Sequence, residues 1–177
     1  MTRVLGVDPG TSVTGWGVVE SASGGHRRVA SGVISLSARL ALPHRLRRIH
    51  AAVRSLILEH RPAALSLEKA FVSRNVQSAF RLGEARGAVL IAAADCGVEV
   101  FEYAPAEVKQ SVVGYGRADK GQMLRGVALL LAVESLRRAD EADALAAAVC
   151  HLRVAGWREA VGVRESIPGR SRANGAR

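Results

Sequence analysis

Four acidic residues stand at positions where a fold could gather them. Asp8 ends the apolar run of residues 3–7, and Glu68 ends a similar run farther along. Because ligand sites of open α/β sheets gather at the carboxyl ends of neighbouring parallel strands, these two carboxylates are expected to meet. Asp140 and Asp143 are spaced to share one face of a helix, with Cβ atoms about 5–6 Å apart. That helix could add two more carboxylates to the same crevice.

Such a cluster predicts a divalent metal site. Four neighbouring anions repel one another, which raises their pKa values unless a cation compensates. Hard oxygen ligands suit Mg²⁺ or Mn²⁺, which bind through a few carboxylates together with waters and substrate phosphates. Each acid alone also has a simple structural explanation. Asp8 precedes a Pro-Gly turn, and Asp140 falls at a helix start, where the helix dipole favours acids. Glu68 is the acid that such structural explanations account for least well.

The elements that must position these acids follow from hydrophobic periodicity. Residues 3–7, 13–20 and 29–36 are predicted to form a β-meander, and residues 63–67 and 97–103 two further strands. Helices are predicted over residues 38–60 and 75–95, from 105 to about 113, from about 120, and from about 140 onward. This order indicates an α/β fold with a mixed five-stranded sheet, a β-meander plus parallel strands, flanked by helices.

The predicted helix over residues 75–95 carries an apolar stripe with two glycines in it. The glycines would let another backbone approach closely, so the stripe suits helix packing or a dimer surface. Its members are Val76, Phe80, Gly83, Gly87, Leu90 and Ile91.

Composition limits the class of protein. The chain has 177 residues, 49% of them hydrophobic, which predicts one folded domain and excludes a wholly disordered chain. We expect that domain to span residues 1–157 and a disordered basic tail to follow at 158–177. The net charge of +9 favours a polyanion such as nucleic acid as the large partner. No apolar run is long enough for a membrane span, and a cytoplasmic protein is expected.

Five spaced segments, in order between about residues 3 and 155, resemble the RuvC family of Holliday-junction resolvases. They are residues 4–10, 67–71, 74–75 with 82–87, 108–114, and 139–146. The resemblance implies a ribonuclease H-like fold, a homodimer, and Mg²⁺-dependent cleavage of two symmetrically placed strands in a four-way DNA junction. The metal-binding catalytic set would be Asp8, Glu68, Asp140 and Asp143. The third of these is His in some family members, so Asp140 keeps this site all-carboxylate.

The same resemblance implies a mechanism and DNA contacts. Two metal ions would activate a water and stabilise the departing 3′ oxygen, leaving 5′-phosphate and 3′-hydroxyl ends. Lys109 and Lys120 match family residues that contact phosphate, and Phe71 matches an aromatic placed to stack on a base at the crossover. Further candidates for the phosphate path, from their place near the predicted helix, are Arg74, Arg81 and Arg86. The branch-migration proteins RuvA and RuvB are expected partners by resemblance alone.

Other interpretations remain open at this point. Another ribonuclease H-like nuclease would use the same metal chemistry on a different nucleic acid. A non-catalytic junction-binding protein would use the acids only as caps and turns. An actin-like ATPase would need two such domains and about twice the length. His151 is interpreted as a structural group, and Cys150 and Trp16 as core residues.

Overall fold

The structure is a computed structural model, and it describes residues 1–69, 76–134, 136 and 138–162. The predicted DNA-binding residues Phe71 and Arg74 lie outside the described residues, as does the tail from residue 163.

A five-stranded sheet in the order β3-β2-β1-β4-β5 forms the centre of the molecule. β1 pairs antiparallel with β2, and β2 with β3, whereas β1 pairs parallel with β4, and β4 with β5. This confirms the predicted meander followed by parallel strands. The strands are β1 (Arg3–Asp8), β2 (Val13–Ala22), β3 (Gly25–Ser35), β4 (Ala64–Glu68) and β5 (Glu99–Tyr103).

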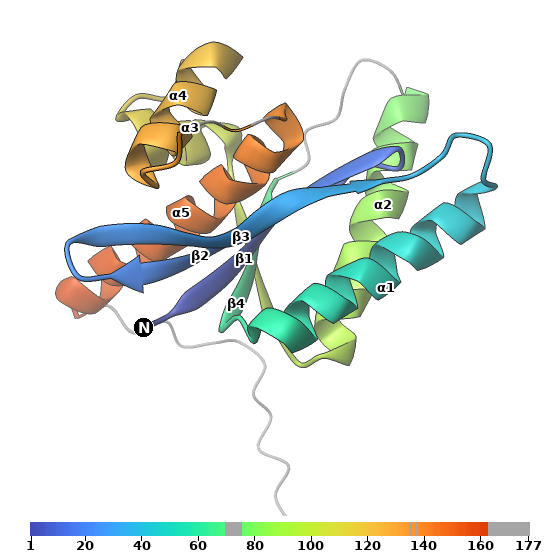
Figure 1. Ribbon diagram of the computed structural model, residues 1–177, viewed down its shortest axis with the longest axis horizontal. Helices are drawn as coiled ribbons and strands as arrows, with labels where there is room; N and C mark the ends of the chain where they lie inside the picture. Colours follow the sequence, from blue (N-terminus) through green and yellow to red (C-terminus); the bar gives the residue numbers. More distant parts are fainter. Residues whose placement is uncertain (70–75, 135, 137, 163–177) are drawn as a thin grey trace, which may run out of the picture.

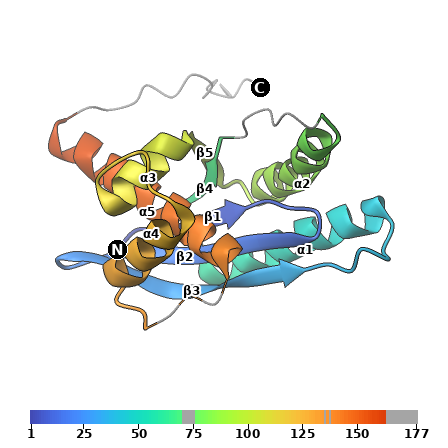
Figure 2. The same cartoon turned by 90° about the horizontal axis from the view of Figure 1, so that it is seen from above.

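Helices cover both faces of the sheet (Figures 1 and 2). α1 and α2 pack on one face, and α3, α4 and α5 pack on the other. Their bounds are α1 (Leu42–His60), α2 (Val76–Asp95), α3 (Pro105–Val113), α4 (Lys120–Leu130) and α5 (Ala139–Ala160). α5 thus continues three residues past the domain end predicted at residue 157. No described helix is long and apolar enough to cross a membrane.

Strand β3 begins four residues earlier than its apolar content predicts. A tight turn at Gly24, whose φ is +88°, starts the strand at Gly25. The polar start of β3 then pairs with the end of β2, and Arg27 forms an ion pair with the buried carboxylate of Glu20. Cross-strand hydrogen bonding and this ion pair, rather than apolar periodicity, therefore define the start of the strand.

Helix α2 buries a different face from the predicted apolar stripe. Small residues pack against the sheet, among them Ala85, Ala88 and Val89. Phe80 is 69% exposed and Ile91 is 58% exposed. Of the predicted stripe, most members therefore face away from the core of the described chain.

Candidate active site

Glycines in the sheet allow the backbone of helix α5 to pack closely against the strands. A Cβ added at Gly15 would lie 1.9 Å from the carbonyl oxygen of Asp140, and one at Gly6 would lie 1.9 Å from that of Ala144. Gly15 is paired across the sheet with Asp8. Glycine in a strand allows such a close backbone approach because it has no side chain. The start of α5 is thereby held beside the end of β1.

Parallel pairing brings the two strand-end acids to the same edge. Val7 of β1 is in register with Leu67 of β4, so Asp8 and Glu68 are the next residues on adjacent strands. Glu68 is in turn in register with Tyr103 of β5. The structure therefore gathers at one edge the carboxylates that the sequence places at two strand ends and at the start of a helix.

Burial and like charge together perturb Asp8. Its pKa is raised to about 7, first by burial and then by the negative charges of Asp143, Asp140 and Glu68. The ammonium of Lys120 acts in the opposite direction. All three other acids therefore act on Asp8, which is the electrostatic signature of one shared cluster.

Glu68 and Asp143 are perturbed in the same direction. Burial raises the pKa of Glu68, and the charge of Asp143 adds to the rise while Lys109 lowers it. Burial also raises the pKa of Asp143, which Asp140 raises further and the two lysines lower. Lys109 and Lys120 are thus counter-charges of the cluster as well as candidate phosphate contacts.

Two of the hollows beside these acids are bordered by Glu68. One, of about 220 Å³, is lined by Glu68 and Asp143 together with Lys109 and Lys120. The other, of about 250 Å³, is lined by Asp8, Glu68 and Arg86, among others. Asp8, Glu68 and Asp143 therefore border open space that a substrate group can enter, and Glu68 borders both hollows.

Asp140 stands at the outer side of the cluster. One of its carboxylate oxygens lies 3.6 Å from a guanidinium nitrogen of Arg138, and its side chain is 38% exposed. The next residue, Glu141, accepts a hydrogen bond of 2.6 Å from the hydroxyl of Ser31 on β3. This bond fastens the first turn of α5 to the sheet and so limits where Asp140 can move.

The donor set suits a hard divalent cation. In the described part of the chain, no three Asp, Glu, His or Cys side chains are close enough together to hold an ion as they stand. The raised pKa values of Asp8, Glu68 and Asp143 show the unrelieved repulsion and burial that a cation would offset. The acidic side chains at this edge that could contribute oxygen ligands are those of Asp8, Glu68, Asp140 and Asp143.

The candidate DNA-binding residues fall into different surroundings. Lys109 is half-buried on α3, and Lys120 is exposed at the first position of α4, after a capping box of Asp119 and Gln122. Arg81 is exposed on α2. Arg86 instead donates to the carbonyl oxygen of Glu68 and to the Glu102 carboxylate, partners that its spacing on the helix did not indicate.

The three side chains interpreted as structural or core residues are buried or half-buried. His151 is buried, and its Nδ1 lies 2.8 Å from the hydroxyl of Tyr103. Cys150 is buried, which raises the pKa of its thiol to about 11. Trp16 is half-buried and stacks on His60.

Residues 4–151 match the family model described as crossover junction endodeoxyribonuclease RuvC. The chain belongs to the RuvC family. Among RuvC proteins, that of Alkalilimnicola ehrlichii is 47% identical over 155 residues, which cover 88% of this chain and 93% of that protein. The RuvC of Halorhodospira halophila is 48% identical over 151 residues, covering 85% and 90%.

A solved RuvC structure supports the same conclusion about the fold. It is that of T. thermophilus RuvC in complex with Holliday junction substrate, with a TM-score of 0.84 and 35% identity. The match covers 92% of this chain and 98% of that one. The ribonuclease H-like fold expected from the sequence is thereby confirmed.

Proposed function

We propose that this chain is a Holliday-junction resolvase, an endodeoxyribonuclease that cuts two symmetrically placed strands of a four-way DNA junction. The RuvC family match and the likeness to a RuvC bound to junction DNA support the substrate. The observation that supports the site assignment is that Asp8 meets Glu68 and the start of α5 at one edge of the sheet. Burial and the charges of the three other acids raise its pKa to about 7 there. The function implied by the resemblance is therefore also the one that this cluster suits best.

The four acids are the proposed metal-binding catalytic set. Mg²⁺, with Mn²⁺ as a substitute, would supply two positive centres that activate a water and stabilise the departing 3′ oxygen. Asp8, Glu68, Asp140 and Asp143 would hold these ions as ionised carboxylates. The product ends would be a 5′-phosphate and a 3′-hydroxyl, and no covalent enzyme intermediate is needed.

Basic and aromatic residues around the acids would hold the DNA. Lys109 and Lys120 border the hollow that contains Glu68 and Asp143, a suitable place to bind the phosphates beside the scissile bond. Phosphate contacts of this kind position the duplex without reading its sequence. Phe71 is proposed to stack on a base at the crossover, and Arg74 and Arg81 to follow the phosphate path.

A homodimer is proposed through the exposed stripe of α2. Apart from the backbone of α2 itself, an added Cβ at Gly83 or Gly87 would have no described atom within 4 Å, so the helix surface there is open to a second backbone. Phe80 and Ile91 would give such a contact its apolar area. A two-fold dimer presents two identical sites, which matches the two-fold symmetry of a junction and the paired cuts.

Further partners follow from the family. RuvA and RuvB would supply junctions by branch migration, and junction cleavage would take place in the cytoplasm.

Isosteric amides test the catalytic set. Asp8→Asn, Glu68→Gln, Asp140→Asn and Asp143→Asn should each abolish Mg²⁺-dependent cleavage of a synthetic four-way junction while leaving junction binding intact. Duplex and RNA–DNA hybrid serve as competing substrates in the same assay. Full activity in any one variant would remove that residue from the site. Equal cutting of the hybrid and the junction would favour a different ribonuclease H-like nuclease.

A further inference from the structure

Arg86 joins three elements next to the proposed site. It lies on α2, and its Nη1 donates a hydrogen bond of 3.0 Å to the backbone carbonyl oxygen of Glu68. Its Nη2 donates to Oε1 of Glu102 on β5, with which it forms an ion pair. The side chain is only 13% exposed. The guanidinium therefore fastens the end of β4 to both α2 and β5.

Glu68 stands where the sheet stops supporting the chain. It is the last residue of β4, and the amide of Lys69 makes the next backbone bond, 2.8 Å to the carbonyl oxygen of Tyr103. A carboxylate at a strand end needs such supports if it is to be held within the small tolerance that catalysis demands. The carbonyl of Glu68 itself is fixed by Arg86.

We infer that Arg86 is a positioning residue for Glu68, and that Glu102 holds its guanidinium in place. This rests on the proposed role of Glu68 in the catalytic set. Arg86 thus acts on the reaction through the backbone of Glu68 rather than by touching DNA. A planar guanidinium suits the task because it can donate to two acceptors from a fixed fork, which a lysine ammonium cannot reproduce.

The contacts favour this role over that of a phosphate contact. Both terminal nitrogens of Arg86 already donate to protein oxygens, and one of these oxygens belongs to a carboxylate that competes with phosphate. To bind DNA, the side chain would have to leave Glu102 and release the carbonyl of Glu68. Arg81, five residues earlier on α2, is exposed and carries no such bond to Glu68.

Cleavage and binding of a synthetic four-way junction, measured separately on the full-length protein, test the inference. For Arg86→Gln we expect a single-turnover rate at saturating enzyme about 10- to 100-fold below wild type, the usual cost of losing an outer-shell partner. The Mg²⁺ concentration giving half the maximal rate should rise. Junction affinity and its salt dependence, measured without divalent metal, should match wild type. Arg86→Lys should recover part of the rate.

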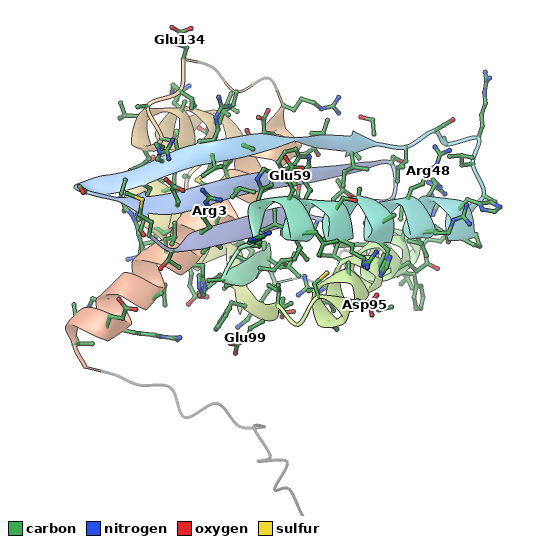
Figure 3. All side chains as sticks on the ribbon, turned by 60° about the horizontal axis from the view of Figure 1, so that its bottom comes forward. Arg3, Arg48, Glu59, Asp95, Glu99 and Glu134 are labelled. Carbon is green, nitrogen blue, oxygen red and sulfur yellow. The ribbon has the colours of Figure 1, made fainter. Side chains whose placement is uncertain are left out.

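Glu102→Gln provides a second variant. The Glu102 side chain is partly exposed, so this change does not disturb the hydrophobic core. It should slow cleavage in the same manner but less, because the carbonyl of Glu68 remains as a partner. Glu99→Gln is the matched control, since Glu99 is exposed at the opposite end of β5 (Figure 3). Arg54→Gln, on the exposed face of α1, is the control for the lost arginine charge.

Three results would overturn the inference. The first is that Arg86→Gln weakens junction binding and lowers the slope of log affinity against log salt by about one, while the cleavage rate at saturating enzyme stays at the wild-type value. That result is expected if Arg86 contacts a phosphate. Glu102→Gln could tighten binding by releasing an arginine for DNA, or leave the cleavage rate unchanged. If Arg86→Gln fails to fold, the rate of Glu102→Gln decides. Glu68→Gln is measured in the same assay. If Glu68→Gln cuts normally, the proposed catalytic set is wrong. If Glu68→Gln is inactive while Glu102→Gln is fully active, only the proposed role of Arg86 is wrong.

Discussion

Replacing Asp8 by Asn should make the metal-free protein more stable. The pKa of Asp8 rises from 3.8 to about 7 on folding, so between these values the folded state binds a proton that the unfolded state has lost. Keeping this carboxylate ionised in the folded state therefore costs free energy, and the cost grows as the pH rises through this window. Asn has the same shape without the charge, and it removes the cost.

The size of the effect follows from the shift. With a folded pKa of about 7, the cost is about 2 kcal/mol at about pH 5 and about 4 kcal/mol at about pH 8. Asp8→Asn should raise the free energy of unfolding by amounts of this order, with the larger gain at the higher pH. Saturating Mg²⁺ should reduce the stability difference between Asp8→Asn and wild type, because the ion binds and stabilises only the folded wild-type protein. At 100 times its dissociation constant, Mg²⁺ adds about 2.7 kcal/mol.

Urea unfolding of wild type and Asp8→Asn at the two pH values, in chelator and in Mg²⁺, measures the stability difference and its dependence on pH and on the metal. Glu134→Gln is the control, because Glu134 is exposed (Figure 3) and is not among the charges that shift the pKa of Asp8. The electrostatic reasoning would be refuted if the stability difference between Asp8→Asn and wild type were the same at both pH values, or if Asp8→Asn were less stable than wild type in chelator. If Mg²⁺ does not stabilise the wild-type protein, the acid cluster does not bind the metal.

Other substitutions test the remaining parts of the site and the proposed dimer. Lys109→Ala should weaken junction binding and reduce the slope of log affinity against log salt by about one, and an unchanged slope would count against a phosphate contact. Gly15→Ala should push α5 off the sheet, because its Cβ would meet the carbonyl of Asp140; we expect a loss of about 1–3 kcal/mol in urea unfolding together with slower cleavage, and an unaltered protein would show that the close approach is dispensable. Phe80→Glu should convert the dimer to monomers in analytical ultracentrifugation and abolish paired cuts, and a dimer that persists would place the interface elsewhere.

The sequence predicts where the four acids lie in the fold, because local rules decide their placement. Apolar runs that end in an acid predict that Asp8 and Glu68 terminate strands, and the parallel pairing of β1 and β4 brings them together. A spacing of three residues on a helix predicts that Asp140 and Asp143 share a face, whatever the helix packs against.

Long-range packing is what sequence patterns leave out. Gly6 and Gly15 are recognisable in strands, yet their purpose depends on which helix lies over them, and only the fold shows that it is α5. For the same reason Arg86 reads as a surface arginine on α2, since its partners on β4 and β5 come from other parts of the chain. The polar start of β3 is missed because cross-strand bonding, not hydrophobicity, defines it.

Crystals of the protein soaked in Mn²⁺ test the central claim most directly, because anomalous scattering locates the ions. We expect two peaks about 3.5–4 Å apart, bounded by the carboxylates of Asp8, Glu68, Asp140 and Asp143, and their loss in Asp8→Asn. Ions bound elsewhere, or no ion at this edge of the sheet in a protein that cuts junctions, would contradict it.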